Sequence, residues 1–269
     1  MIERLLDLIG CEFIDFGHVI DDAQKLTGLY LEHYHQGKIQ GYTPVLMHRD
    51  YELPAWYWDH FNVPPSAKHY PILVEKILNL VNSKSYEAWH NEIFEKYTLD
   101  IFDDEKSDED KMRSLIEEIF SPVSEAQYLL QIQSQKAVPL RIQKYVRPDK
   151  WESTDNDICY VDKDDVLALI PTCKSYEVLA WLPIGGFNWC PTAEYQTAFA
   201  KHMFESYGAE VMSVYGNQIE FYLPEPLTDK EKVFAAAHDL VVMDEDRFND
   251  MEVAPRLVYG KQWLRLWWD

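Results

Sequence analysis

The sequence predicts an α+β fold that closes on a short aromatic strand at the end of the chain. Apolar residues recur at helical spacing in some segments and alternate with polar residues in others. Gly216-Asn217 separates two alternating segments, as in a two-residue β-hairpin. The last residues, 262–268, alternate again and carry three of the nine tryptophans. The chain has 269 residues, 47% of them hydrophobic, which is enough to build two interiors.

The C-terminal part predicts a ferredoxin-like split-βαβ domain with the order β-α-β-β-α-β. Thr192 can cap its first helix, which Gly208 ends, and Thr228 with Glu231 forms a capping box for the second. The predicted elements are a strand at 177–183, a helix at 193–207, strands at 211–215 and 218–223, a helix at 228–241 and a strand at 262–268. In this order the last strand lies inside the sheet, beside residues 177–183.

Alternation in the last strand separates two sets of side chains. Leu264, Leu266 and Trp268 share one side, and we expect that side to be covered by helices. Trp263 and Trp267 then lie on the opposite side.

The N-terminal part mixes helices and strands, and residues 166–172 add a flanking strand to the C-terminal part. A polar segment at 147–157 is the expected link, so we predict an N-terminal α+β domain at 1–150 and a C-terminal domain at 160–269. The predicted N-terminal helices are 2–9, 21–35, 52–61, 72–81, 85–97 and 111–120, and the strands are 12–16, 41–47 and a hairpin within 129–146.

The chain is strongly acidic, with 46 Asp and Glu against 25 Lys and Arg and a net charge of −21. Nucleic acids and anionic membranes are bound by clusters of cationic side chains, and we find none in the sequence. We therefore expect no nucleic-acid and no membrane partner. A basic protein is the partner class that this charge allows.

The cysteines and the N-terminus favour the cytoplasm. Cys11, Cys159, Cys173 and Cys190 are widely spaced and form no CxxC pair, which is typical of reduced thiols. The first residues are acidic where a signal peptide is basic, and no apolar segment reaches the length of a membrane span.

A motif before the first C-terminal helix carries a family resemblance. It reads Gly185-Gly186-Phe187-Asn188-Trp189-Cys190-Pro191, and the chain ends in Trp267-Trp268-Asp269. With Tyr207-Gly208-Ala209 and Ile219-Glu220-Phe221 between them, residues 177–269 resemble the bacterial family of domain of unknown function 4253. The resemblance implies no activity. Relatives often have a second Cys-Pro-Asp after the second helix, where this chain reads Val242-Met243-Asp244.

The motif and the chain end supply the candidate site residues. The candidates for binding are Gly185, Gly186, Asn188, Trp189, Cys190, Trp267, Trp268 and Asp269. Both glycines suit a turn with positive φ. Cys190 is the candidate catalytic residue, because a helix N-terminus lowers a thiol pKa, although a buried structural cysteine is the interpretation we prefer.

We expect no metal site and no cofactor. His33 and His35 form an HxH pair, but two helical residues at this spacing point in different directions. No HExxH, P-loop or GxSxG motif occurs. The carboxylates at 117–118 and 244–246 are expected to be solvated, and the aromatic residues Tyr51 and 56–58 are expected to be core.

The leading functional hypothesis is a non-enzymatic binding protein whose acidic surface faces a basic protein. A toxin that the protein neutralises is one such partner, by analogy with other small acidic bacterial proteins. A hydrolase or thiol enzyme that uses Cys190 is one alternative, and a small-ligand sensor is another, because a fold does not decide function.

Overall fold

The computed structural model describes residues 4–16, 23–97, 113–114, 117, 142–144, 159–161, 164–187, 190–244 and 254–268. The predicted helix at 111–120, the hairpin within 129–146 and the link at 147–157 lie wholly or largely outside these residues.

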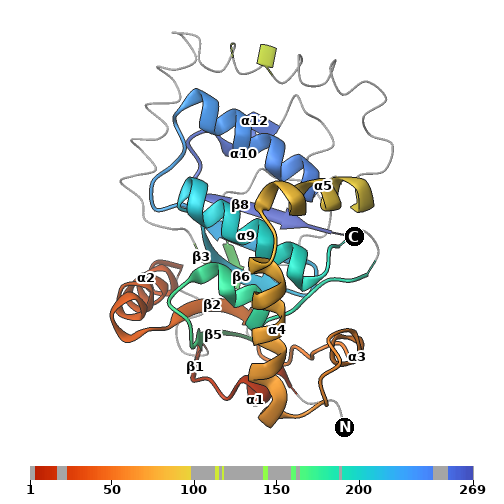
Figure 1. The fold of residues 1–269 in the computed structure, drawn as a ribbon. Coiled ribbons are helices and arrows are strands. Elements are labelled where there is room, and N and C mark those ends of the chain that lie inside the picture. Colours follow the sequence, from red (N-terminus) through yellow and green to blue (C-terminus); the bar gives the residue numbers. More distant parts are fainter. Residues whose placement is uncertain are drawn as a thin grey trace, which may run out of the picture.

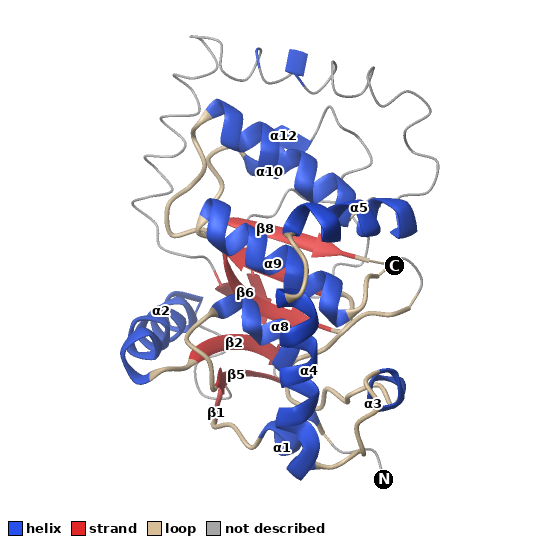
Figure 2. Cartoon of the chain, viewed as in Figure 1, coloured by secondary structure: helices blue, strands red, loops and turns tan. Residues whose placement is uncertain are grey.

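A mixed sheet of six strands, in the order β1-β5-β2-β6-β7-β8, forms the centre of the protein (Figure 2). Strands β2 and β6 are parallel, and the other neighbours are antiparallel. The strands are β1 (Phe13–Asp15), β2 (Thr43–His48), β5 (Asp165–Ile170), β6 (Glu210–Tyr215), β7 (Gln218–Tyr222) and β8 (Trp263–Trp267). A separate pair joins β3 (Ile142–Lys144) to β4 (Cys159–Val161).

Helices pack on both faces of the sheet. Figure 2, in the same view as Figure 1, shows α4, α8 and α9 lying across one face, with α2 away from them on the other side of the strands. The α-helices are α1 (Leu5–Ile9), α2 (Ala23–Gln40), α3 (Trp56–His60), α4 (Tyr70–Asn82), α5 (Tyr86–Tyr97), α8 (Val178–Trp181), α9 (Ala193–Tyr207), α10 (Lys230–Met243) and α12 (Ala254–Val258). Two 3₁₀ turns, η1 (Ala67–His69) and η2 (Ser175–Glu177), precede α4 and α8. Among the described helices, none has both the length and the apolar character needed to cross a membrane.

Strand alternation divides the interior into two hydrophobic clusters. In β2, Val45 and Met47 join the larger cluster on the side of α4, α8, α9 and α10. Leu46 between them joins the smaller cluster, where it packs with Leu26 and Tyr30 of α2. The sheet is therefore buried on both faces, which explains why β2 is apolar at most of its positions.

Most elements predicted from the sequence are confirmed. Helix α9 occupies residues 193–207 as expected, and its C-cap Gly208 has a φ of 70°. The hairpin turns at Gly216-Asn217, between β6 and β7. The predicted capping box is wrong by one residue, because the N-cap of α10 is Asp229, whose carboxylate accepts a 3.0 Å hydrogen bond from the N–H of Lys232.

The strand predicted at 177–183 is wrong, because this segment lies in η2 and α8. A short apolar segment fits a buried helix as well as a strand, and periodicity alone does not separate them. Residues 177–183 therefore do not pair with the last strand, and β2 from the N-terminal part joins the sheet beside β6. The strand order therefore differs from the predicted split-βαβ arrangement, and the fold is α+β with a six-stranded mixed sheet.

The final strand was also predicted in the wrong place. Strand β8 pairs with β7 and lies at the edge of the sheet, not in its interior. The predicted division of its side chains is confirmed: Leu264, Leu266 and Trp268 are buried in the larger cluster, whereas Trp263 and Trp267 are partly exposed.

The two parts of the chain share this sheet. Strands β1 and β2 come from the predicted N-terminal domain, and β5 to β8 come from the predicted C-terminal domain. The boundary predicted at 150–160 lies almost entirely outside the described residues.

Candidate functional site

A tight turn precedes α9 and contains the two predicted glycines. Gly185 and Gly186 have φ values of 88° and 76°, so both adopt the left-handed conformation that the sequence predicted. The N–H of Gly186 donates to the carbonyl of Cys190, and the N–H of Cys190 donates to the carbonyl of Phe187, each at 2.9 Å. These bonds close the turn. Asn188 and Trp189, which lie within it, are outside the described residues.

Both glycines are also required by close packing. A Cβ atom on Gly185 would lie 2.0 Å from the carbonyl oxygen of Pro191, and one on Gly186 would lie 2.1 Å from the Trp56 ring. The turn therefore packs directly against α3, the helix that carries Trp56.

Tyr57 of α3 holds the start of α9 in place through the hydrogen bonds of its hydroxyl group. Its buried hydroxyl donates to the carbonyl of Ile184 and accepts a 3.0 Å hydrogen bond from the N–H of Ala193. Thr192 is the N-cap of α9, as predicted, but its side chain makes no capping bond. A phenol from a distant helix thus satisfies one of the first-turn amides of α9, which have no acceptor within the helix.

Cys190 is buried and is not an activated nucleophile. The Gln196 amide donates to its sulfur at 3.3 Å and to the carbonyl of Pro191 at 2.7 Å. Burial, together with the nearby negative charge of Asp244, raises the pKa of the Cys190 thiol well above its usual value, although the hydrogen bond from Gln196 acts in the opposite direction. The effect of the helix N-terminus is therefore outweighed, and the thiol stays protonated.

Asp244 connects this turn to the end of the chain. Its carboxylate, which has no exposed surface, acts electrostatically on Cys190 and accepts a 2.6 Å hydrogen bond from the N–H of Trp267. The Trp268 indole donates to the carbonyl of Met243 at 3.1 Å. The structure thus brings Cys190, Trp267 and Trp268 into one neighbourhood. The expectation that Asp244 is solvated is wrong, and Asp269 lies outside the described residues.

Three polar atoms near the start of α9 are buried and have no hydrogen-bond partner among the described residues. They are the hydroxyl of Thr192, one carboxylate oxygen of Glu194 and the amide oxygen of Gln196. Glu194 is 5% exposed, and its other oxygen lies 3.4 Å from Nε2 of His60, a residue of α3 whose side chain is about half exposed. Buried acceptors in proteins are nearly always satisfied by protein groups, ordered water or a ligand, so these atoms mark positions where a further donor can bind.

A second polar cluster joins α5, α9 and α10 around Asp239. One carboxylate oxygen of Asp239 accepts a hydrogen bond from the Tyr207 hydroxyl at 2.7 Å and lies 2.8 Å from Nε2 of His202. The other oxygen accepts from the Tyr86 hydroxyl at 3.2 Å. The Tyr86 ring stacks on the His202 ring, with centroids 3.6 Å apart.

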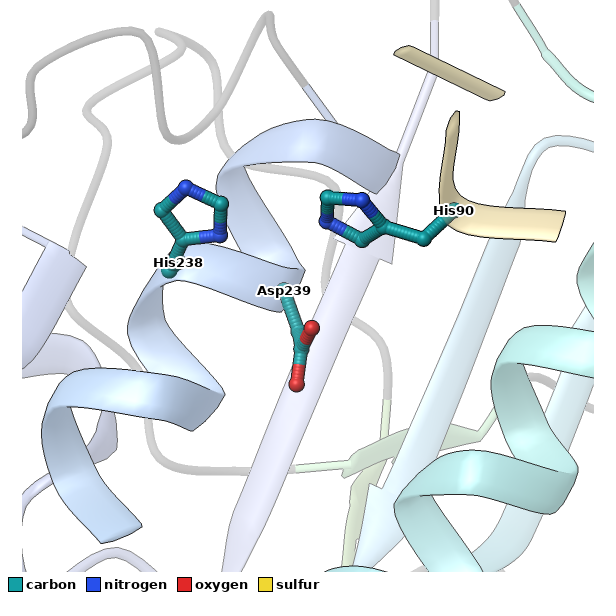
Figure 3. A group of neighbouring side chains, drawn as sticks. All are labelled: His90, His238 and Asp239. Atoms are coloured by element: carbon teal, nitrogen blue, oxygen red, sulfur yellow. The ribbon is translucent and has the colours of Figure 1, made fainter. Parts of the chain in front are cut away.

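His90 and His238 also lie close to Asp239. One ligand atom from each of these three residues lies within 4.8 Å of the others (Figure 3). Burial is the main effect on the pKa of His90, and it lowers that pKa. The nearby Asp239 carboxylate raises it, and the imidazoles of His238 and His202 lower it. The sequence reasoning missed this group because His90 is far from His238 along the chain, so no ligand spacing signals it.

The cluster also contains a series of Ser, His and Asp side chains in contact, as in a hydrolase triad. The Ser206 hydroxyl lies 3.2 Å from Nδ1 of His202, whose Nε2 contacts Asp239. Acyl-transfer chemistry also needs free donors for an oxyanion. The amides of Gly208 and Ala209, which follow Ser206, already donate to carbonyls of α9, so they cannot serve as those donors.

The HxH pair does not form a ligand pair. Both residues lie on α2, where His33 Nδ1 is 3.1 Å from the Tyr42 hydroxyl and His35 packs against Tyr34. The aromatic segment after β2 is mostly core, as predicted, with Tyr57 and Trp58 buried.

Comparison with known proteins locates the motif within a family. No curated protein and no solved structure matches the chain. One family model matches residues 166–269, which begin in β5 and include the turn, Asp244 and β8. The resemblance inferred from the sequence is thereby confirmed, and the C-terminal part of the chain matches the family Domain of unknown function (DUF4253).

Proposed function

We propose that this protein is a non-enzymatic binding protein for a basic protein partner, and that Glu194 receives one cationic side chain of that partner. The observation that carries the proposal is one buried Glu194 carboxylate oxygen that has no hydrogen-bond partner among the described residues. A buried carboxylate is costly unless it is well paired, and a cation at this oxygen would add to the contact that the other oxygen makes with His60.

The surroundings of Glu194 suit a guanidinium or ammonium group. Trp56 lies beside His60, with ring centroids 5.7 Å apart, and Phe187 in the adjoining turn is 39% exposed. Aromatic rings attract cations through their faces. An arginine can combine this stacking with hydrogen bonds to a carboxylate, which makes it the side chain that fits best.

The charge distribution favours the same class of partner. Seven described Lys and Arg side chains form ion pairs within the chain, so they neutralise carboxylates instead of forming a basic surface. The pairs are Arg4–Asp50, Lys38–Glu210, Arg49–Asp15, Lys84–Glu92, Lys174–Glu177, Lys230–Glu117 and Arg265–Glu220. The surplus of acidic residues, with a net charge of −21, would attract a polycation from a distance.

The proposal places the protein in the cytoplasm, where a basic toxin that it neutralises is one partner of this kind. The free thiols of Cys11, Cys173 and Cys190 suit a reducing compartment. The buried, protonated Cys190 argues against the thiol-enzyme alternative. The sensor alternative uses the same site, because a small guanidine could also pair with Glu194.

The proposal is tested with Glu194→Gln and a matched control, Glu75→Gln, which removes one exposed charge from α4. The probe is an octa-arginine peptide, titrated by calorimetry at two salt concentrations. We expect Glu194→Gln to weaken binding at least about tenfold, because pairing with a buried charge is lost, and Glu75→Gln to have little effect. Binding should also weaken with salt, since the field is screened over about 8 Å at physiological ionic strength.

Thermal melting separates a binding role from a structural one. Because one Glu194 oxygen has no partner among the described residues and glutamine keeps the shape of the side chain, Glu194→Gln should change the melting temperature little. An equal loss of peptide affinity in both variants would mean that only the net charge of the protein attracts the peptide, and it would refute Glu194 as the binding site. If free arginine binds as tightly as the peptide, the result would favour a small ligand over a protein partner.

A further inference from the structure

We propose that His90, His238 and Asp239 form a binding site for a late first-row divalent cation, of which Zn²⁺ is the representative. The site is independent of the proposed partner-binding role. It joins α5, which carries His90, to α10, which carries the other two residues. Figure 3 shows the two imidazole rings side by side, with the Asp239 carboxylate below them in the view.

The geometry requires only a small adjustment to hold an ion. The three ligand atoms lie within 4.8 Å of one another, and the two rings are nearly parallel, with centroids 5.6 Å apart. In a tetrahedral zinc site, bonds of about 2.0–2.1 Å place ligand atoms about 3.3 Å apart. His90 and His238 are both only partly buried, and rotation of their side chains would have to close that difference.

The remaining partners of Asp239 support a ligand role. The hydrogen bond from Tyr207 and the contact with His202 fall on one carboxylate oxygen, whereas the other receives a longer bond, from Tyr86. The carboxylate is therefore held in place with one oxygen less engaged. Outer-shell partners of this kind orient metal ligands and tune their basicity.

The donor set selects the class of cation. Two imidazoles and a carboxylate suit Zn²⁺, Co²⁺ or Ni²⁺, whereas Ca²⁺ and Mg²⁺ prefer oxygen ligands throughout. Metals bind the neutral form of imidazole, so binding should weaken as the pH falls and the histidines become protonated. Three protein ligands leave a fourth position of the ion open to water.

The site has a structural consequence that can be measured. An ion bound to His90 and to His238 would cross-link α5 to α10. Because the folded protein would hold the ion more tightly than the unfolded chain does, added Zn²⁺ should raise the melting temperature.

The test uses the full chain without a histidine tag, stripped with a chelator and titrated with Zn²⁺ by calorimetry. We expect one ion per chain, and with Co²⁺ we expect visible absorption of a tetrahedral site. His90→Gln and His238→Gln should each lower the affinity at least about tenfold, since even outer-shell changes commonly have effects of this size. The matched control is His69→Gln, whose imidazole bonds to Ser66 outside the cluster.

Melting curves without metal check that each variant is folded. Because His90 and His238 are replaced in separate variants, the test still stands if one of the two does not fold. Binding of less than one ion per chain, or equal Zn²⁺ affinity in His90→Gln, His238→Gln and His69→Gln, would overturn the proposal. A Ca²⁺ titration with the same response as Zn²⁺ would also contradict it.

Discussion

Asp244 and Trp267 are joined by a 2.6 Å hydrogen bond in which the backbone N–H at the end of β8 donates to a fully buried carboxylate. The bond ties the C-terminal end of α10 to the edge strand of the sheet. A charged acceptor of this kind makes a stronger bond than a neutral one. The attachment of β8 therefore depends on one side chain as well as on its pairing with β7.

Removing this carboxylate should loosen the chain end. We expect Asp244→Ala to lower the free energy of unfolding by about 1–3 kcal/mol, because it leaves a buried donor without an acceptor. Asp244→Asn should cost less, since its amide oxygen can still accept. Urea unfolding measures both, with the exposed Glu231→Ala as a control for lost charge. An Asp244→Ala protein as stable as the control would show that the bond contributes nothing.

The two tryptophans near the chain end should differ in their effect on stability. Trp268 is buried and hydrogen-bonded, whereas Trp267 is partly exposed on the opposite face of the strand. Trp268→Ala should cost about 3–5 kcal/mol, and Trp267→Ala should cost clearly less. Thermal and chemical unfolding compare them. The reverse order would indicate that the outer face of β8, not the core face, holds the strand.

Gly185 allows the effects of conformation and space to be separated. Gly185 and Gly41 have nearly equal φ values, 88° and 86°, but a Cβ atom on Gly41 would meet no atom within 4 Å. Gly41→Ala should therefore cost only the strain of a left-handed residue, roughly 1–2 kcal/mol. Gly185→Ala should cost a further 1–3 kcal/mol or so from overpacking. Equal losses in the two variants would mean that the turn at Gly185 can expand.

The cysteines should react with alkylating reagents in the order of their exposure. Cys173 is exposed, Cys11 is partly buried, and Cys190 is buried. Burial raises the pKa of Cys11 from 9.0 to about 11, so at pH 8 few molecules carry its reactive thiolate. Cys11 labelling should speed up as the pH rises toward 11. Mass spectrometry of labelled peptides follows each site, and labelling of native Cys190 as fast as Cys173 would contradict its protonated, buried state.

Local signals in the sequence were sufficient where an element has its own boundaries. Thr192 and Gly208 mark the ends of α9, and Gly216-Asn217 marks the hairpin, so these elements are found where they were predicted. Alternation in β8 also identified its buried face. Each of these features is decided by neighbouring residues.

Choices between distant segments could not be predicted in this way. Residues 177–183 and β2 are both short apolar segments, and only the assembled structure shows that the first is largely helical and the second is a strand beside β6. The candidate sites have the same origin. Glu194 meets His60, and Asp239 meets His90, through the packing of helices far apart along the chain, and no spacing in the sequence encodes such a contact.

The position of β2 has a consequence for how the protein is made. Its neighbours in the sheet, β5 and β6, begin only at Asp165 and Glu210, so ribosomes must add about 120 further residues after His48 before β2 can pair. At synthesis rates of about 5–20 residues per second, this apolar strand waits several seconds or more without a partner. We therefore expect nascent chains to need a chaperone that shields Thr43–His48 until translation of the second half has begun to supply its partners.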